Sequence, residues 1–188
     1  MRNLMTLTAL ATLAMATPAM AQVTGTVDID GSVADRCLFT TDNAVISVGE
    51  LALAGAGSTA GKLDTSKLDG QTRTLIGWCN GTAATMEVEA FALENTDFTG
   101  SAPTGFDTRI DFTATADANE ATATDTSLDA GKGAAAGVGL FTGNIDVTLS
   151  ASSTPTSGLL VAGGYVGQVV VTLTPNISFG GGSEQPLP

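Results

Sequence analysis

The chain reads VTGTVDIDGSV from residue 23 to residue 33, and this short stretch carries the clearest β-type pattern of the sequence. Its odd-numbered positions carry apolar side chains or glycine, whereas its even-numbered positions carry Thr, Asp or Ser. A period of two is typical of a β-strand with one buried face, because successive side chains of a strand point to opposite sides. A helix would scatter the same valines around its circumference. We therefore predict a strand here, and its core-facing positions would be Val23, Gly25, Val27, Ile29, Gly31 and Val33.

Similar β-type stretches recur along the rest of the chain and are separated by Gly, Asn, Asp or Pro. We expect strands at residues 45–48, 73–78, 85–91, 109–115, 145–149 and 168–174. The segments between them are rich in Ala, Gly, Thr or acidic residues and are expected to be exposed loops or an insertion: 51–61, 95–104 and 116–139. Strands with short connections and no long amphipathic helix predict an all-β fold, an antiparallel β-sandwich.

Size and composition limit the functions that the chain can have. A chain of 188 residues can form one domain but not two full cores. It has 19 acidic and 7 basic residues, so neither nucleic acid nor an anionic membrane is expected as a partner. It contains no histidine, which excludes Ser-His-Asp and Cys-His catalytic groups and zinc sites that need imidazole.

Residues 1–21 have the composition of a secretory signal peptide. Arg2 gives a positive start, residues 4–15 are mainly apolar, and Ala19-Met20-Ala21 is a small-x-small cleavage site. We predict cleavage after Ala21 and export across the inner membrane; an uncleaved membrane anchor is the alternative.

The two cysteines, Cys37 and Cys79, would then lie in an oxidising compartment, where a disulfide is the simplest state of a pair. Closing a loop of this length stabilises the fold by ~4 kcal/mol on the chain-entropy model. A redox pair or a pair of metal ligands is the alternative, although no further Cys and no His would complete a metal site. We expect Trp78 to pack in the core against the disulfide.

Acidic side chains are the remaining candidates for chemistry. Four of them are close in sequence: Asp117, Glu120, Asp125 and Asp129. They could gather around a cation in a folded loop, and a solvated acidic loop is the alternative. Two carboxylates can also hydrolyse glycosides, but one Trp and one Tyr leave little to stack on a sugar ring. We expect a non-enzymatic protein without a cofactor or metal.

Three segments resemble bacterial pilus subunits that are assembled by the chaperone–usher pathway, including the spore-coat-U-like pilins. Residues 25–37 resemble the N-terminal extension that runs into the first strand and its cysteine. Residues 74–82 (TLIGWCNGT) resemble the end of the second strand with the partner cysteine. Residues 161–174 (VAGGYVGQVVVTLT) are similar to the closing strand of the family, whereas residues 95–144 have no counterpart.

The resemblance implies an immunoglobulin-like sandwich that lacks its last strand and leaves an apolar groove beside its final strand. Residues 22–36 would be the donor segment, residues 37–179 the domain, and residues 180–188 a disordered tail. The acceptor edge would be the strand that carries Val169, Val171 and Leu173, and Ile177 and Phe179 share its parity and could extend it. The N-terminal segment of the next subunit would fill the groove by β-augmentation, so like subunits would form a homopolymer.

The resemblance also implies a periplasmic chaperone, an outer-membrane usher and a final location in a surface fibre, with no insertion into a membrane. Two alternatives stay open. The domain could be complete by itself, with the N-terminal strand paired in its own sheet, and act as a surface or coat module. It could instead be a calcium-dependent binder or a secreted hydrolase.

Overall fold

The computed structural model describes residues 23–176, which divide into two parts, residues 23–32 and residues 33–176. In the first part no residue belongs to a strand, and Val23, Val27 and Ile29 are 91%, 87% and 91% exposed. The prediction of a strand with a buried face is therefore wrong for the single chain. A strand is stable only when a neighbour pairs with its backbone and covers its apolar face.

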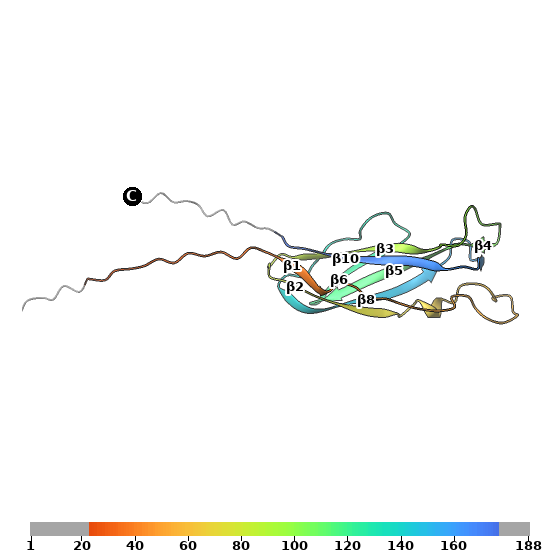
Figure 1. The fold of residues 1–188 in the computed structure, drawn as a ribbon, viewed down its shortest axis with the longest axis horizontal. Helices are drawn as coiled ribbons and strands as arrows, with labels where there is room; N and C mark the ends of the chain where they lie inside the picture. The colour runs from red at the N-terminus through yellow and green to blue at the C-terminus, as the bar shows by residue number, and fades with distance from the viewer. Residues whose placement is uncertain (1–22, 177–188) are drawn as a thin grey trace, which may run out of the picture. The chain divides into compact units, whose positions relative to one another are not determined.

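The second part is an antiparallel β-structure with one short 3-10 helix, η1 (Thr65–Lys67) (Figure 1). Its strands are β1 (Cys37–Thr41), β2 (Thr72–Cys79), β3 (Thr85–Asn95), β4 (Phe106–Asp107), β5 (Arg109–Ala118), β6 (Ala121–Thr126), β7 (Ala136–Gly137), β8 (Phe141–Ser153), β9 (Leu159–Leu160) and β10 (Tyr165–Thr174). The main sheet has the order β1-β2-β8-β5-β3-β10, with β6 paired to β5 and β7 paired to β3. Strands β4 and β9 form a separate parallel pair.

The main sheet curves into a nearly closed barrel that has one open side. Each of the six strands in the path is antiparallel to its neighbour, and β5 meets β3 at only two residue pairs. The path begins at β1 and ends at β10, and no backbone pairing joins these two strands. We call this gap between β1 and β10 the seam. The expected all-β antiparallel class is thus confirmed, and the barrel is not closed.

The core consists of alternate residues of the long strands. Met86 and Val88 of β3, Ile110 of β5 and Ile145 of β8 are completely buried. Each contributes about 1.5–3 kcal/mol to folding through burial of its side chain. Thr, Asp, Asn and Ser residues occupy most of the intervening positions, which gives the alternation expected of strands with one wet face, although Asp111 of β5 is buried.

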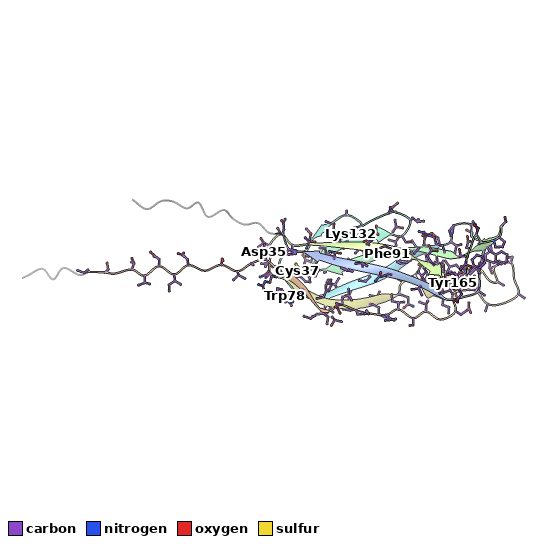
Figure 2. The ribbon with its side chains drawn as sticks, turned by 45° about the horizontal axis from the view of Figure 1, so that its top comes forward. Asp35, Cys37, Trp78, Phe91, Lys132 and Tyr165 are labelled. Atoms are coloured by element: carbon purple, nitrogen blue, oxygen red, sulfur yellow. A yellow bond between two sulfur atoms is a disulfide. The ribbon has the colours of Figure 1, made fainter. Side chains whose placement is uncertain are left out.

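The disulfide between Cys37 and Cys79 is present, and the two residues face each other directly in the β1–β2 pair. This confirms the predicted pairing. We expected Trp78 to pack in the core against the disulfide, but it does not. Its neighbours Gly77 and Cys79 are buried, so Trp78 points to the outer side, opposite Leu38, which is 54% exposed. Figure 2 shows Cys37 and Trp78 at the same end of the domain.

The segment 116–139 is not the exposed loop that we expected. It contains the end of β5, all of β6 and β7, and the buried side chains Ala116, Ala118, Ala123 and Val138. Alanine has a low strand propensity, but here it forms the apolar half of a Thr/Ala alternation, and the neighbouring strands decide the structure.

Five other predicted strands are confirmed as parts of β2, β3, β5, β8 and β10, whereas residues 45–48 form no strand. No helix among residues 23–176 is long and apolar enough to cross a membrane. The predicted signal peptide, Ile177, Phe179 and the predicted disordered tail lie outside the described residues.

Candidate functional site

The seam opens into a groove of about 1170 Å³ between β10 and residues 42–52. Its floor consists of apolar core side chains: Leu68, Leu75, Leu93, Phe112, Val147 and Leu149. We call this hollow the seam groove. Core residues line a surface groove only where the layer that should cover them is missing, so the seam is a gap in the hydrophobic core as well as in the hydrogen bonding.

One wall of the seam groove is β10. Val169, Val171 and Leu173 stand opposite Ala90, Val88 and Met86 of β3, so they face the core. The three β3 residues are 5%, 0% and 0% exposed, whereas the three β10 residues are only partly buried. In the main sheet β10 pairs with β3 alone, so the backbone along its other edge is unpaired. Of the predicted acceptor-edge residues, Val169 and Val171 therefore line the groove, and Leu173 continues the same strand beyond it.

The opposite wall is an extended segment without a partner strand. In residues 42–50 no backbone group forms a hydrogen bond with another backbone group of the described chain. Ile46 and Val48 pack against the core, whereas Val45 is 70% exposed. Both walls of the groove thus present unpaired backbone groups, which folded proteins normally satisfy.

Arg73 fixes this second wall. It lies on β2 at the same parity as Leu75 and Cys79, which are core-facing, and it lines the groove. Its Nε donates to the carbonyl oxygen of Val45 at 2.8 Å, and its Nη1 donates to that of Thr72 at 2.7 Å. The side chain therefore holds residues 42–48 in place by a bond to their backbone and leaves their other backbone groups free.

The groove ends towards the disulfide, where β10 approaches β2. A Cβ atom on Gly77 would lie 3.2 Å from Cδ1 of Leu173 and 3.1 Å from the carbonyl oxygen of Leu38. Such distances are tighter than most Cβ contacts, so a side chain at position 77 would require these neighbours to shift by a few tenths of an ångström. Val171 lines the groove and Leu173 does not.

Asp107 organises the opposite end of the groove. Its carboxylate accepts hydrogen bonds from the N–H of Thr156 at 3.1 Å and of Gly158 at 2.7 Å, and its backbone oxygen accepts from the Tyr165 hydroxyl at 3.2 Å. Burial alone would raise the pKa of Asp107, but the hydrogen bonds from Gly158, Thr156 and Thr154 outweigh it and hold the pKa below its ordinary value. These bonds position residues 158–165, some of which line the groove.

The predicted donor positions are Val23, Gly25, Val27, Ile29, Gly31 and Val33. All six are exposed and none belongs to a strand. A Cβ atom on Gly25 or Gly31 would meet nothing within 4 Å. The four apolar side chains of this set are therefore exposed to solvent among residues 23–176.

The acidic residues considered as a cation cluster do not gather into one among the described residues. Asp125 is buried and accepts the backbone N–H of Ala90 at 2.7 Å, and Asp117 accepts the hydroxyl of Thr122 at 2.5 Å. Among the residues that the structure describes, no group of three or more His, Cys, Asp or Glu side chains could hold a metal ion. Each of these two carboxylates has a separate structural partner.

The roles of Arg73, Asp107 and the unpaired wall at residues 42–50 are not among the features predicted from the sequence. A signal for Arg73 existed, since it is the charged residue in the series Arg73-x-Leu75-x-Gly77-x-Cys79 of inward parity. A charged residue at a core-facing position is usually paired with a hydrogen-bonding or ionic partner. Nothing in the sequence indicates the role of Asp107, because its partners lie about fifty residues away.

Comparison of the chain with protein-family models, with curated proteins and with solved structures finds no match.

Proposed function

We propose that this protein is a secreted structural subunit that polymerises into surface fibres by donating its N-terminal segment to the seam groove of a neighbouring copy. The observation that carries the proposal is the seam groove itself, a hollow with an apolar floor and with unpaired backbone along both walls. The same chain has an exposed segment with the alternating pattern of a strand. The groove lacks a strand, and the exposed segment has the pattern of one, so the segment of one copy could pair with the groove of another by β-augmentation.

The strand order supports the idea that the missing element is a single strand beside β10. The order β1-β2-β8-β5 followed by β3-β10 supports an immunoglobulin-like sandwich whose last strand, beside β10, would be absent. The limited pairing between β3 and β5 is compatible with two sheets that meet at one edge. A donated strand would lie between β10 and residues 42–50 and would complete the sandwich.

The energy available to the contact is considerable. The four apolar side chains Val23, Val27, Ile29 and Val33 would contribute roughly 6–12 kcal/mol at ~1.5–3 kcal/mol each, before the cost of ordering the segment. The even-numbered positions, which include Asp28 and Asp30, would face the solvent. Hydrogen bonds to both walls would add to this stability and slow the release of the strand.

The proposed location follows from the oxidised cysteine pair. A disulfide is typical of an oxidising, extracytoplasmic compartment. With residues 1–21 as a signal peptide, the subunit would pass through the periplasm to the cell surface, and the fibre would serve adhesion or biofilm formation. A periplasmic chaperone would cover the open groove before assembly, and an outer-membrane usher would order the subunits. An exposed apolar groove would otherwise favour aggregation.

Deletion of residues 22–30 tests the proposal. The intact protein should form oligomers of increasing size, and the deletion variant should be a folded monomer that binds a synthetic peptide of residues 22–33. Size-exclusion chromatography with light scattering measures the first result, and titration with a labelled peptide measures the second. A matched peptide with Val27→Asp and Ile29→Asp should not bind. Stable monomers in both cases would contradict strand donation and favour a self-contained surface module.

A further inference from the structure

The two ends of the main sheet have directions that would allow them to pair with each other. Each neighbouring pair in the six-strand path is antiparallel, so its first strand, β1, runs antiparallel to its last strand, β10. Residues 42–50 follow directly on β1 and line the groove opposite β10. If they moved across the groove and paired with β10, the barrel would close. Closure would satisfy the unpaired backbone of both walls and remove both sheet edges.

Residues 42–50 are instead linked to β2, by the side chain of Arg73. The backbone pairing between β1 and β2 shifts register after Phe39 and ends at Thr41. Beyond that point, the bond from Nε of Arg73 to the carbonyl oxygen of Val45 is the one hydrogen bond that joins residues 42–50 to a strand, among the residues that the structure describes. Arg73 thus holds this wall on the side of β2, across the groove from β10.

The charge of Arg73 has no other explanation in the structure. The salt bridges found within residues 23–176 involve Arg109 and Lys132, and both printed donors of Arg73 bind backbone carbonyl oxygens. A charged group beside an apolar floor is costly unless its hydrogen-bonding groups are used. Methionine, which is also unbranched, would cover the same floor without that cost. The contact that arginine provides here, and methionine cannot, is the bond to Val45.

We propose that Arg73 is a positioning residue that keeps the seam open: its bond to Val45 holds residues 42–50 away from β10 and leaves the groove free for a strand of a neighbouring copy. The consequence for assembly rests on the proposed function. Without this bond the two walls pair with each other, and a donated strand must first separate them. An incoming strand binds more weakly when the open form of its site is only a fraction of the population. Arg73 needs no contact with the donated strand to have this effect.

The test uses the full-length, disulfide-bonded protein with Val27→Asp and Ile29→Asp, which cannot donate its own segment and should stay monomeric. We call this protein the reference chain. Hydrogen exchange should show residues 42–50 unprotected in the reference chain. Adding Arg73→Met should protect them, together with alternate residues of β10, because the two walls now pair. The melting temperature should be equal or higher, since closure satisfies backbone groups that are otherwise unpaired.

Binding of a labelled peptide of residues 22–33 measures the effect on the groove. A hydrogen bond from a charged donor changes an equilibrium by about tenfold or more, so Arg73→Met should bind the peptide at least about tenfold more weakly than the reference chain. Arg73→Lys keeps a charged donor and should retain most of the binding. Lys67→Met removes the same charge from an exposed position of η1 outside the groove, so it should behave as the reference chain.

Each outcome decides one of the two proposals. If the reference chain binds the peptide and Arg73→Met changes neither the binding nor the exchange of residues 42–50, the role of Arg73 is overturned and strand donation stands. Failure of Arg73→Met to fold, or faster exchange throughout the domain, also overturns that role, because closure requires equal or higher stability. If the reference chain does not bind the peptide, strand donation is contradicted. Protection of residues 42–50 in Arg73→Met would then still support the hold that Arg73 has on the wall.

Discussion

Replacing Ile29 by alanine tests which face of residues 23–33 enters the groove. Ile29 is 91% exposed in the single chain, so the substitution removes no packing from the domain. The free energy of unfolding of an isolated subunit should therefore stay unchanged. In a neighbour's groove the same substitution would remove three carbon atoms from an apolar contact, and only assembly should weaken.

The size of the effect follows from the number of atoms lost. At ~0.8 kcal/mol per buried carbon, Ile29→Ala should weaken the contact by about 2.4 kcal/mol, which is about 50-fold in the dissociation constant. Val27→Ala removes two carbons and should weaken it by about 1.6 kcal/mol, or about 15-fold. Asp28→Ala, on the opposite parity, should change the dissociation constant little.

Binding of labelled peptides of residues 22–33 to the chain that lacks residues 22–30 measures these differences directly. Fluorescence anisotropy at one salt concentration allows the three substitutions to be compared without the complication of polymer length. An equal loss for Asp28→Ala and Ile29→Ala would refute the assignment of the odd-numbered face. Unchanged binding for all three peptides would show that these side chains do not reach the floor of the groove.

Three further predictions concern the domain itself. Met86→Ala in the completely buried centre of β3 should lower the free energy of unfolding by about 2–5 kcal/mol in a denaturant titration, because a cavity remains; a loss below 1 kcal/mol would contradict the core assignment. Replacing Cys37 and Cys79 together by Ser should lower it by ~4 kcal/mol, measured against the oxidised wild type. The folded-state pKa of Asp107 is lowered, so its stabilisation is complete above the ordinary pKa of an unfolded Asp, about 3.9, and is lost as the pH falls through the folded-state value. Asp107→Asn should therefore be less stable than the wild type near neutral pH, and the difference should shrink in acid; a constant difference between pH 7 and pH 2 would contradict this.

The alternation of side chains made most of the fold predictable, since the polar and apolar faces of β2, β3, β5, β8 and β10 can be read from residue parity. The same rule should have placed Trp78 outside, because it lies between two inward residues. Alanine was the main source of error. Ala116, Ala118 and Ala123 have little side chain to bury, and only their neighbours in the sheet determine whether they form strands or loops.

The groove was predictable only in outline. The resemblance to pilus subunits led to the expectation of an unpaired edge beside Val169 and Val171, and the structure places both residues on a wall with an unpaired edge. The second wall could not be predicted, because residues 45–48 have the composition of a strand but lack a strand to pair with. The side chains of Arg73, Asn80 and Asp107 form hydrogen bonds that hold neighbouring parts of the chain in place. These bonds could not be predicted, because the partners are distant in sequence.

The crossing of Leu173 over Gly77 makes the groove blind at one end. A donated strand that enters from the open end must stop there, so the close approach of Leu173 to Gly77 limits how far the strand can enter. In the proposed fibre, every junction would then have the same length.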